Sequence, residues 1–188
     1  DVITGDSFGN GLYGGAGNDF LSPGAAFVKL NQRDIVDGGD GIDTVNFADT
    51  APDSFGGRTG GVSVNLASGQ AIEIYGGPGG SWMSATLISI ENAIGTSGND
   101  ILTGGLGNDF FVFNTAPNST TNRDAITDFN VVADTIRLEN AVFTALGLAT
   151  GTLASTMFKN LTTGGAVDAN DRILYNDTTG QLFYDSDG

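Results

Sequence analysis

Short clusters of glycine and aspartate alternate along this chain with apolar stretches of about three residues. The clearest cases run from Gly14 to Ser22, from Gly38 to Asn46 and from Gly104 to Val112. Each begins with Gly-Gly-x-Gly, has an aspartate at its sixth position and an apolar residue at its eighth. Since apolar and polar residues alternate over so few positions, each stretch predicts a short β-strand with one buried face.

The eighth position of each repeat predicts the core. Neighbouring side chains of a strand point to opposite faces, so one residue of each short strand is expected to face inward. These inward residues are Leu12, Leu21, Val36, Val45, Ala93, Leu102 and Phe111. They predict a thin apolar core between two layers of strands.

Weaker copies of the repeat lie in the same frame. The copy from Gly5 to Tyr13 has Asn10 at the acidic position, and the copy from Gly95 to Thr103 has Thr96 at the second glycine. Second halves alone are found at residues 1–4, 34–37 and 91–94. Because the first residues read as the end of a repeat, we expect the chain to be a piece of a longer protein.

The repeats predict a domain over residues 1–112 that an insertion at about 47–85 interrupts. Val62, Val64 and Leu66 alternate strictly and are followed by Ile72 and Ile74, which predicts a β-hairpin with its bend near residues 68–69. The aromatic pair Tyr75 and Trp82, with Met83, could pack against the repeats or form a sugar-stacking surface.

Residues 113–188 predict a β-rich C-terminal cap, because glycine thins out there. Four stretches have strand character, and a short helix is expected at residues 141–149. The predicted strands are at residues 125–129, 134–138, 172–176 and 181–185. A turn signal, Asp-Thr-Thr-Gly at residues 177–180, predicts that the last two form a hairpin.

Composition narrows the possible functions. The net charge is −15, with 22 acidic residues against 7 lysines and arginines, and nearly all the acids are aspartates. Nucleic acids and anionic membranes require clustered basic residues, so we expect neither as a partner. The 30 glycines make ordering the backbone costly, so the fold needs a source of stability besides its core.

Cysteine and histidine are absent, which removes disulfides, thiolate chemistry, the usual zinc sites and histidine-dependent catalysis. No apolar run is long enough to insert into a membrane. A carboxylate pair for glycoside hydrolysis is the remaining catalytic alternative. We expect instead that the regularly spaced aspartates bind metal and that this chain is not an enzyme.

The residue types of the turns favour calcium. Gly-Gly-x-Gly permits positive φ, so carbonyl oxygens can converge on one point, and the following aspartate adds an anionic oxygen. An all-oxygen site with flexible geometry suits Ca²⁺ better than Mg²⁺, which needs a tight octahedron, or Zn²⁺, which prefers nitrogen and sulfur. The competing interpretation is a glycine-rich linker with incidental aspartates.

These repeats match the pattern G-G-x-G-x-D-x-U-x, and the chain resembles the RTX family of secreted bacterial proteins. The resemblance implies an all-β fold, a right-handed parallel β-roll with a β-rich cap. It also implies several Ca²⁺ ions, each held between stacked turns by positions two, four and six of one turn and one, three and six of the next. Asn10 departs from the acidic consensus of the turn that faces Asp34.

Carried over to this sequence, the resemblance implies four pairings of turns. They are Asp1 with Gly14, Ala16 and Asp19; Gly15, Gly17 and Asp19 with Gly38, Asp40 and Asp43; Gly39, Gly41 and Asp43 with Gly95, Ser97 and Asp100; and Leu87, Ser89 and Glu91 with Gly104, Leu106 and Asp109. The remaining oxygens, from Thr96, Gly98, Asp100, Gly105, Gly107 and Asp109, are expected to meet Asp128 and Asp134 of the cap.

We therefore expect an extracellular calcium-binding module that folds on extracellular Ca²⁺ and serves the stability and type I secretion of a larger exported protein. One alternative is a structural part of a calcium-dependent adhesin or surface-layer protein, with surface or self-assembly contacts. Another is the non-catalytic tail of a secreted protease, lipase or polysaccharide-modifying enzyme.

Overall fold

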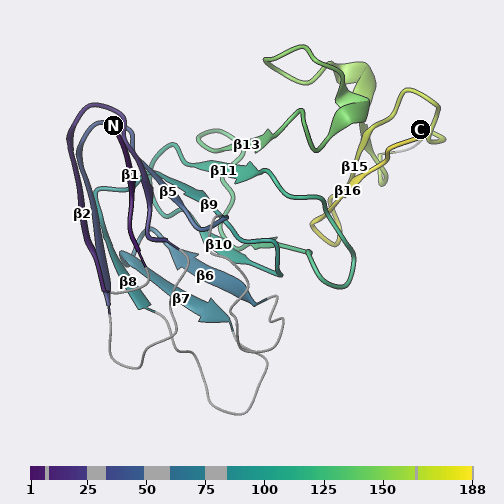
Figure 1. Ribbon diagram of the computed structural model, residues 1–188. Helices are drawn as coiled ribbons and strands as arrows, with labels where there is room; N and C mark the ends of the chain where they lie inside the picture. The colour runs from purple at the N-terminus through teal and green to yellow at the C-terminus, as the bar shows by residue number, and fades with distance from the viewer. Residues whose placement is uncertain (7–8, 25–32, 49–59, 75–83, 164, 188) are drawn as a thin grey trace. The chain divides into compact units, whose positions relative to one another are not determined.

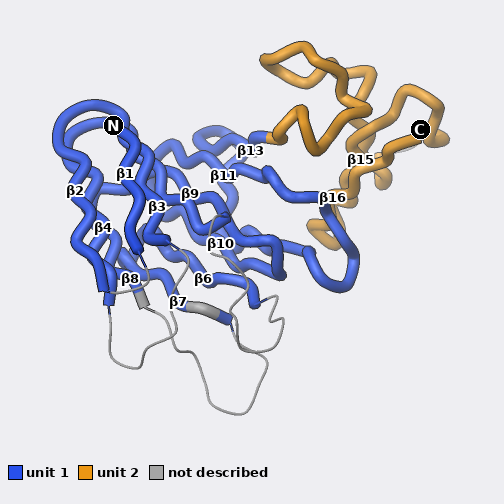
Figure 2. Tube along the Cα trace, viewed as in Figure 1, with its two compact units in different colours: residues 1–137 blue, residues 138–188 orange. Residues whose placement is uncertain are grey.

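The computed structural model describes residues 1–6, 9–24, 33–48, 60–74, 84–163 and 165–187 (Figure 1). These residues form two compact units, Asp1–Arg137 and Leu138–Gly188, which are coloured separately in Figure 2. Unit 1 holds two β-sheets, and unit 2 holds a third. In the described part of the chain, helical structure is confined to two short 3-10 turns, Thr144–Leu146 and Ser155–Met157.

One sheet of unit 1, sheet A, has six strands in the order β1-β3-β5-β9-β11-β13. The pairings from β1 to β11 are parallel. Its strands are β1 (Val2–Thr4), β3 (Phe20–Ser22), β5 (Thr44–Asn46), β9 (Asn92–Ile94), β11 (Phe110–Phe113) and β13 (Thr135–Leu138). Each of the first five is the short apolar end of a repeat, as the pattern predicts.

The facing sheet, sheet B, has seven strands in the order β12-β10-β6-β7-β8-β4-β2. The chain crosses between the two sheets after each short strand, except where β6, β7 and β8 follow one another within sheet B. Its strands are β2 (Gly11–Ala16), β4 (Asp34–Asp40), β6 (Gly61–Asn65), β7 (Gln70–Ile74), β8 (Ser84–Ile88), β10 (Ile101–Thr103) and β12 (Ala125–Ile126).

The predicted hairpin is present in the insertion. β6 and β7 pair antiparallel from Gly61↔Ile74 to Asn65↔Gln70, and the Asn65 side chain accepts a 2.8 Å hydrogen bond from the Ser68 amide in the bend. β7 then pairs antiparallel with β8, which lies parallel beside β4. Residues 75–83, which include Tyr75, Trp82 and Met83, lie outside the described residues, as does 49–59.

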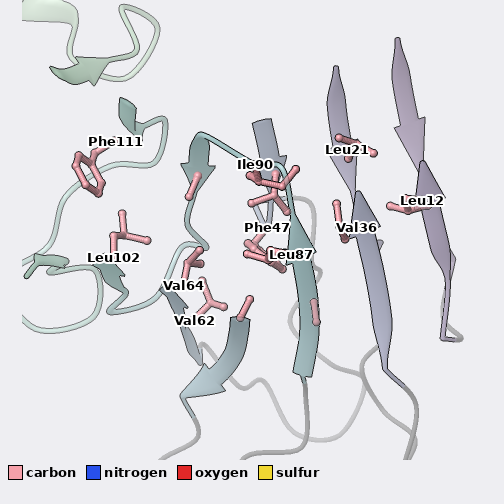
Figure 3. Close-up of a cluster of buried hydrophobic side chains, with 14 residues drawn as sticks. Leu12, Leu21, Val36, Phe47, Val62, Val64, Leu87, Ile90, Leu102 and Phe111 are labelled. Atoms are coloured by element: carbon pink, nitrogen blue, oxygen red, sulfur yellow. The ribbon is translucent and has the colours of Figure 1, made fainter. Parts of the chain in front are cut away.

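The core lies between sheets A and B (Figure 3). All seven residues predicted from the eighth position belong to it, which confirms that part of the pattern. The insertion adds Phe47, Val62, Val64, Ala71 and Ala85, and the chain that returns from it to the repeats adds Leu87 and Ile90. Phe47 is completely buried and follows β5, so this large side chain fills the core where sheet B carries two strands more than the simple repeat supplies.

Strands β12 and β13 extend the two sheets beyond Val112, the predicted end of the roll. Unit 2 has a three-stranded sheet of β14 (Phe158–Asn160), β15 (Ile173–Asn176) and β16 (Gln181–Tyr184). The antiparallel pair β15–β16 confirms the predicted last hairpin. The predicted helix at 141–149 is wrong, because only one 3-10 turn forms and Gly147, at φ +82°, ends it.

Candidate metal centre

The turns that join the two sheets form two edges of the roll. At the first edge the chain passes from sheet B to sheet A, through the turns at 14–19, 38–43, 89–91, 104–109 and 128–134. At the second edge it passes from sheet A to sheet B, and the described residues there are 5–6, 9–10, 23–24, 33–34, 47–48, 60, 95–100 and 113–124. The sixth-position acids of the repeats therefore form two separate columns.

Backbone hydrogen bonds tie the acids of the first edge together. Asp43 Oδ1 accepts the Asp19 amide at 2.7 Å, and Glu91 Oε2 accepts the Asp43 amide at 2.8 Å. Asp134 Oδ1 accepts the Asp109 amide at 3.1 Å, and the Asp1 amino group donates to Asp19 Oδ1. Asp19, Asp43, Glu91 and Asp134 are thus each fixed by the turn before them. The second oxygen of Asp134 also accepts the Asn130 amide at 2.8 Å, whereas Oδ2 of Asp19 and of Asp43 has no donor.

That second oxygen has no hydrogen-bond donor at three buried carboxylates among the described residues. These atoms are Oδ2 of Asp19, Asp43 and Asp109, whose residues are 3%, 0% and 5% exposed. A buried anionic oxygen without a partner is costly, since it has lost its water and gained nothing in return. The donor set therefore fits a cation.

The first glycine of each turn leaves room beside these oxygens. A Cβ built on Gly14 would lie 2.4 Å from Asp19 Oδ2 and 2.6 Å from the Gly38 carbonyl oxygen. A Cβ on Gly38 would lie 2.4 Å from Asp43 Oδ2 and 2.2 Å from the Ser89 carbonyl oxygen. Carboxylate and carbonyl oxygens of successive turns therefore converge on one point, as an oxygen-coordinated cation requires.

The turn at 104–109 gathers further acids. Burial, and after it the charges of Asp134, Asp128 and Glu91, raise the pKa of Asp109 above its ordinary value. Asp128 accepts the amides of Gly104 and Gly105 at 3.0 and 2.8 Å. Both predicted cap residues, Asp128 and Asp134, thus lie against this turn, where like charges concentrate.

Within the described residues, no group of three or more acidic side chains is close enough to hold a metal by itself. Any cation here would depend on the main-chain carbonyls of the turns as well. Those carbonyls are in place: a Cβ on Gly39 would lie 2.0 Å from the Gly15 oxygen, and one on Gly41 would lie 1.9 Å from the Gly17 oxygen. Turns 14–19 and 38–43 therefore stack as expected.

The expected pairing of Asp43 with Asp100 is wrong. Asp43 lies beside Glu91 on the first edge, whereas Gly95, Ser97 and Asp100 lie on the second edge. Three successive strands, β6 to β8, stay in sheet B, so β8 ends at the same edge as β4 and delivers Glu91 there.

The pairing of turn 87–91 with turn 104–109 is only partly present. Glu91 and Asp109 precede adjacent strands, β9 and β11. The neighbour of Leu87, however, is the hairpin bend, because the Leu87 amide donates a 2.9 Å hydrogen bond to the Gly69 carbonyl. A Cβ on Gly105 would lie 2.8 Å from Ala67, and Leu106 is fully exposed, so the bend lies between these two turns.

On the second edge the structure brings the predicted Asp100 together with Asp124, which the sequence interpretation missed. Asp124 Oδ1 accepts the Asp100 amide at 2.9 Å, and Asp100 Oδ1 accepts the Val62 amide at 2.7 Å. Burial raises the pKa of both Asp34 and Asp100, and burial with the charge of Asp100 raises the pKa of Asp124 to about 6. Asp124 follows a stretch without the glycine signal, so the repeat pattern did not mark it.

Ser89 occupies a position where the regular turns have glycine. Its φ is +49°, and it is the single non-glycine residue with positive φ in the described part of the chain. Gly17, Gly41 and Gly107, which also stand two residues before an acid, have φ of +114°, +151° and +133°. Ser89→Gly is therefore expected to raise stability by up to about 1 kcal/mol, because it relieves left-handed strain. Urea denaturation in saturating calcium would measure this, with Ser89→Ala as the control that keeps the strain. Equal midpoints for the two variants would contradict the assignment.

Comparison with known families agrees with this geometry. The model for the peptidase M10 serralysin C-terminal family matches residues 4–149. The chain belongs to the serralysin C-terminal family. This family is the RTX calcium-binding β-roll module of type I-secreted proteins, so the resemblance noted from the repeats and the all-β fold are both confirmed. No curated protein matches the chain closely enough to be reported.

A search of the described residues for a helix long and apolar enough to cross a membrane found none.

Proposed function

We propose that this module binds several Ca²⁺ ions along the first edge and folds when it binds them. The observation that carries the proposal is the set of three buried carboxylate oxygens without a donor, at Asp19, Asp43 and Asp109. Family membership supports the same conclusion. Bound divalent cations would supply the positive charge that these turns lack, and the three carboxylate oxygens would coordinate them.

The residues that would hold the ions follow from the stacking of the turns. Between turns 14–19 and 38–43, the carbonyls of Gly15 and Gly17 face the second turn, and Asp19 Oδ2 lies near the Gly38 carbonyl. Between turns 38–43 and 89–91, Asp43 Oδ2 and the Ser89 carbonyl converge in the same way. At the third place, Asp109 Oδ2 would act with the turn at 104–109, whose Gly104 and Gly105 amides Asp128 holds by hydrogen bonds.

Electrostatics makes folding dependent on the cation. Two carboxylates about 5 Å apart repel by roughly 3 kcal/mol at an effective dielectric of about 20, and the first edge repeats this from turn to turn. An acidic, glycine-rich chain that cannot neutralise these charges is expected to be disordered. The free energy of binding then becomes free energy of folding.

This coupling suits an exported protein. Extracellular calcium modules bind with dissociation constants of roughly 0.1 to 1 mM, so the chain would stay unfolded where free calcium is low and fold outside the cell. We infer that the module serves the stability and secretion of a larger protein. It contributes no catalytic residue of its own in this account.

The family description favours one of the two alternatives. A chain of the serralysin C-terminal family fits the non-catalytic tail of a secreted peptidase more directly than it fits an adhesin or surface-layer protein. Attachment to cells or ordered self-assembly that requires calcium would favour the adhesin instead.

Calorimetric titration with calcium tests the proposal through two charge-matched variants of one turn. Asp43→Asn removes a buried anionic oxygen and keeps the shape, so we expect calcium affinity to fall at least about tenfold, or about 1.4 kcal/mol. Asp40→Asn removes an equal charge from an exposed side chain and keeps the main-chain carbonyl, so affinity should stay close to that of the unchanged protein. Equal losses in both variants would reduce calcium binding to a net-charge effect and refute the proposal.

A further inference from the structure

The buried carboxylates of the two edges are satisfied in different ways. On the first edge, Oδ2 of Asp19, Asp43 and Asp109 has no donor. On the second edge, Asp100 is equally buried, at 2% exposure, yet donors surround it. Its Oδ1 accepts the Val62 amide at 2.7 Å and the Thr96 hydroxyl at 2.8 Å, and its Oδ2 accepts the Thr96 amide at 2.8 Å.

Thr96 is the residue that makes this difference. It stands at the second position of its repeat, where the regular turns have Gly15, Gly39 and Gly105, so only this turn carries a side-chain donor there. Its hydroxyl also accepts the Gly98 amide at 3.0 Å. The same hydroxyl lies 3.2 Å from the Gly60 carbonyl oxygen, which places it at the centre of the turn.

The neighbouring parts of the second edge are closed by the chain as well. Asn10 replaces an acid, and its amide donates to Asp34 Oδ1 at 2.7 Å. The backbone at Gly60 and Gly61 packs directly on turn 95–100, since a Cβ on Gly61 would lie 1.7 Å from the Asn99 carbonyl oxygen. Asp34 and Asp124 thus each accept a backbone amide, as the first-edge acids do, whereas Asp100 accepts three hydrogen bonds, which sets turn 95–100 apart.

We propose that calcium loads along the first edge and that turn 95–100 of the second edge is closed by the chain's own hydrogen bonds, with Thr96 standing in for an ion at Asp100. The proposal rests on the proposed function and excludes turn 95–100 from it. At Asp100 a cation would have to compete with three protein hydrogen bonds that already stabilise the carboxylate, whereas Asp43 Oδ2 has no protein donor to compete with it. The sequence pattern alone treats both turns as ion sites.

The number of ions taken up on folding distinguishes the edges. This number is the slope of the logarithm of the folding constant against the logarithm of calcium activity, and it does not depend on overall stability. We expect Asp43→Asn to lower the slope by about one or more. Asp100→Asn should leave the slope unchanged while it lowers the folding constant, because it places an amide opposite the Thr96 amide.

Thr96 variants test the same point without changing a charge. In saturating calcium, Thr96→Val should lower the folding constant about tenfold, since it removes the hydroxyl and keeps the shape. Thr96→Ser keeps the hydroxyl and should restore most of that loss. If an ion rather than the hydroxyl satisfied Asp100, Thr96→Val would fold as well as the unchanged protein.

The outcomes separate this inference from the function it rests on. A lower slope in Asp100→Asn as well as in Asp43→Asn would overturn the exclusion of turn 95–100 and leave calcium binding intact. A slope of zero in the unchanged protein would instead overturn calcium-coupled folding itself.

Discussion

Removal of calcium is expected to unfold the parallel β-roll of unit 1. The stacked acids Asp19, Asp43 and Glu91 follow one another along the first edge, held by hydrogen bonds of 2.7 and 2.8 Å. Each neighbouring pair contributes repulsion of roughly 3 kcal/mol at about 5 Å, and a domain is stabilised by only about 5 to 15 kcal/mol in total. Two or three unneutralised steps, roughly 6 to 9 kcal/mol, are therefore as large as the whole net stability of a typical domain.

Far-ultraviolet circular dichroism would measure this loss. In excess chelator we expect a disordered spectrum, and in millimolar calcium a β spectrum. Magnesium is the control, because its strict octahedral preference does not suit flexible carbonyl turns, and it should not restore the signal at equal concentration. Equal β content in chelator and in calcium would contradict the expectation.

The second large effect is expected from Gly39→Ala. Gly39 has φ +93°, and its new Cβ would lie 2.0 Å from the Gly15 carbonyl oxygen of the turn before it. This backbone atom cannot swing aside, so turns 14–19 and 38–43 would have to separate. We expect a loss of about 3 kcal/mol or more in stability at saturating calcium, together with weaker calcium binding.

Gly15→Ala is the matched control for that variant. Gly15 has nearly the same conformation, at φ +101°, but a Cβ there would meet nothing within 4 Å. It should therefore cost only the left-handed strain, about 1 to 2 kcal/mol. Urea denaturation of both variants would give the comparison, and equal losses would show that stacking of the turns does not matter.

The repeat pattern predicted the core well because the period of a strand is strict. Leu21, Val36 and Phe111 are set by their distance from the glycine turn, and all three are buried as expected. The hairpin in the insertion was predictable for the same reason, from the alternation of Val62 and Val64. Local spacing carries this information, so no knowledge of tertiary contacts was needed.

Assignment of the turns to an edge could not be made from spacing alone. Each time the chain passes from one sheet to the other, its next turn lies at the opposite edge. The partner of Asp43 therefore depends on how many such passages the insertion contains. Strands β6 to β8 remain in one sheet, and Glu91 rather than Asp100 therefore follows Asp43. A prediction of the third strand, at 84–88 and parallel to β4, would have given the correct number of passages between the sheets.

The closing contacts of the second edge were also beyond the pattern. The repeat pattern places Thr96 at a second-glycine position and among the expected metal residues. Its hydroxyl becomes a donor to Asp100 only when the fold brings the two groups to within 2.8 Å. Asp124 lies in a stretch without glycine turns and reaches Asp100 only through the pairing of β10 with β12. Long-range contacts of this kind leave no periodic mark in a sequence.

The most direct test is an anomalous difference map from crystals of the calcium-loaded protein. The account predicts calcium peaks on the first edge, beside Oδ2 of Asp19, Asp43 and Asp109, and none beside Asp100. Peaks absent from that edge, with these three carboxylates facing solvent, would contradict it.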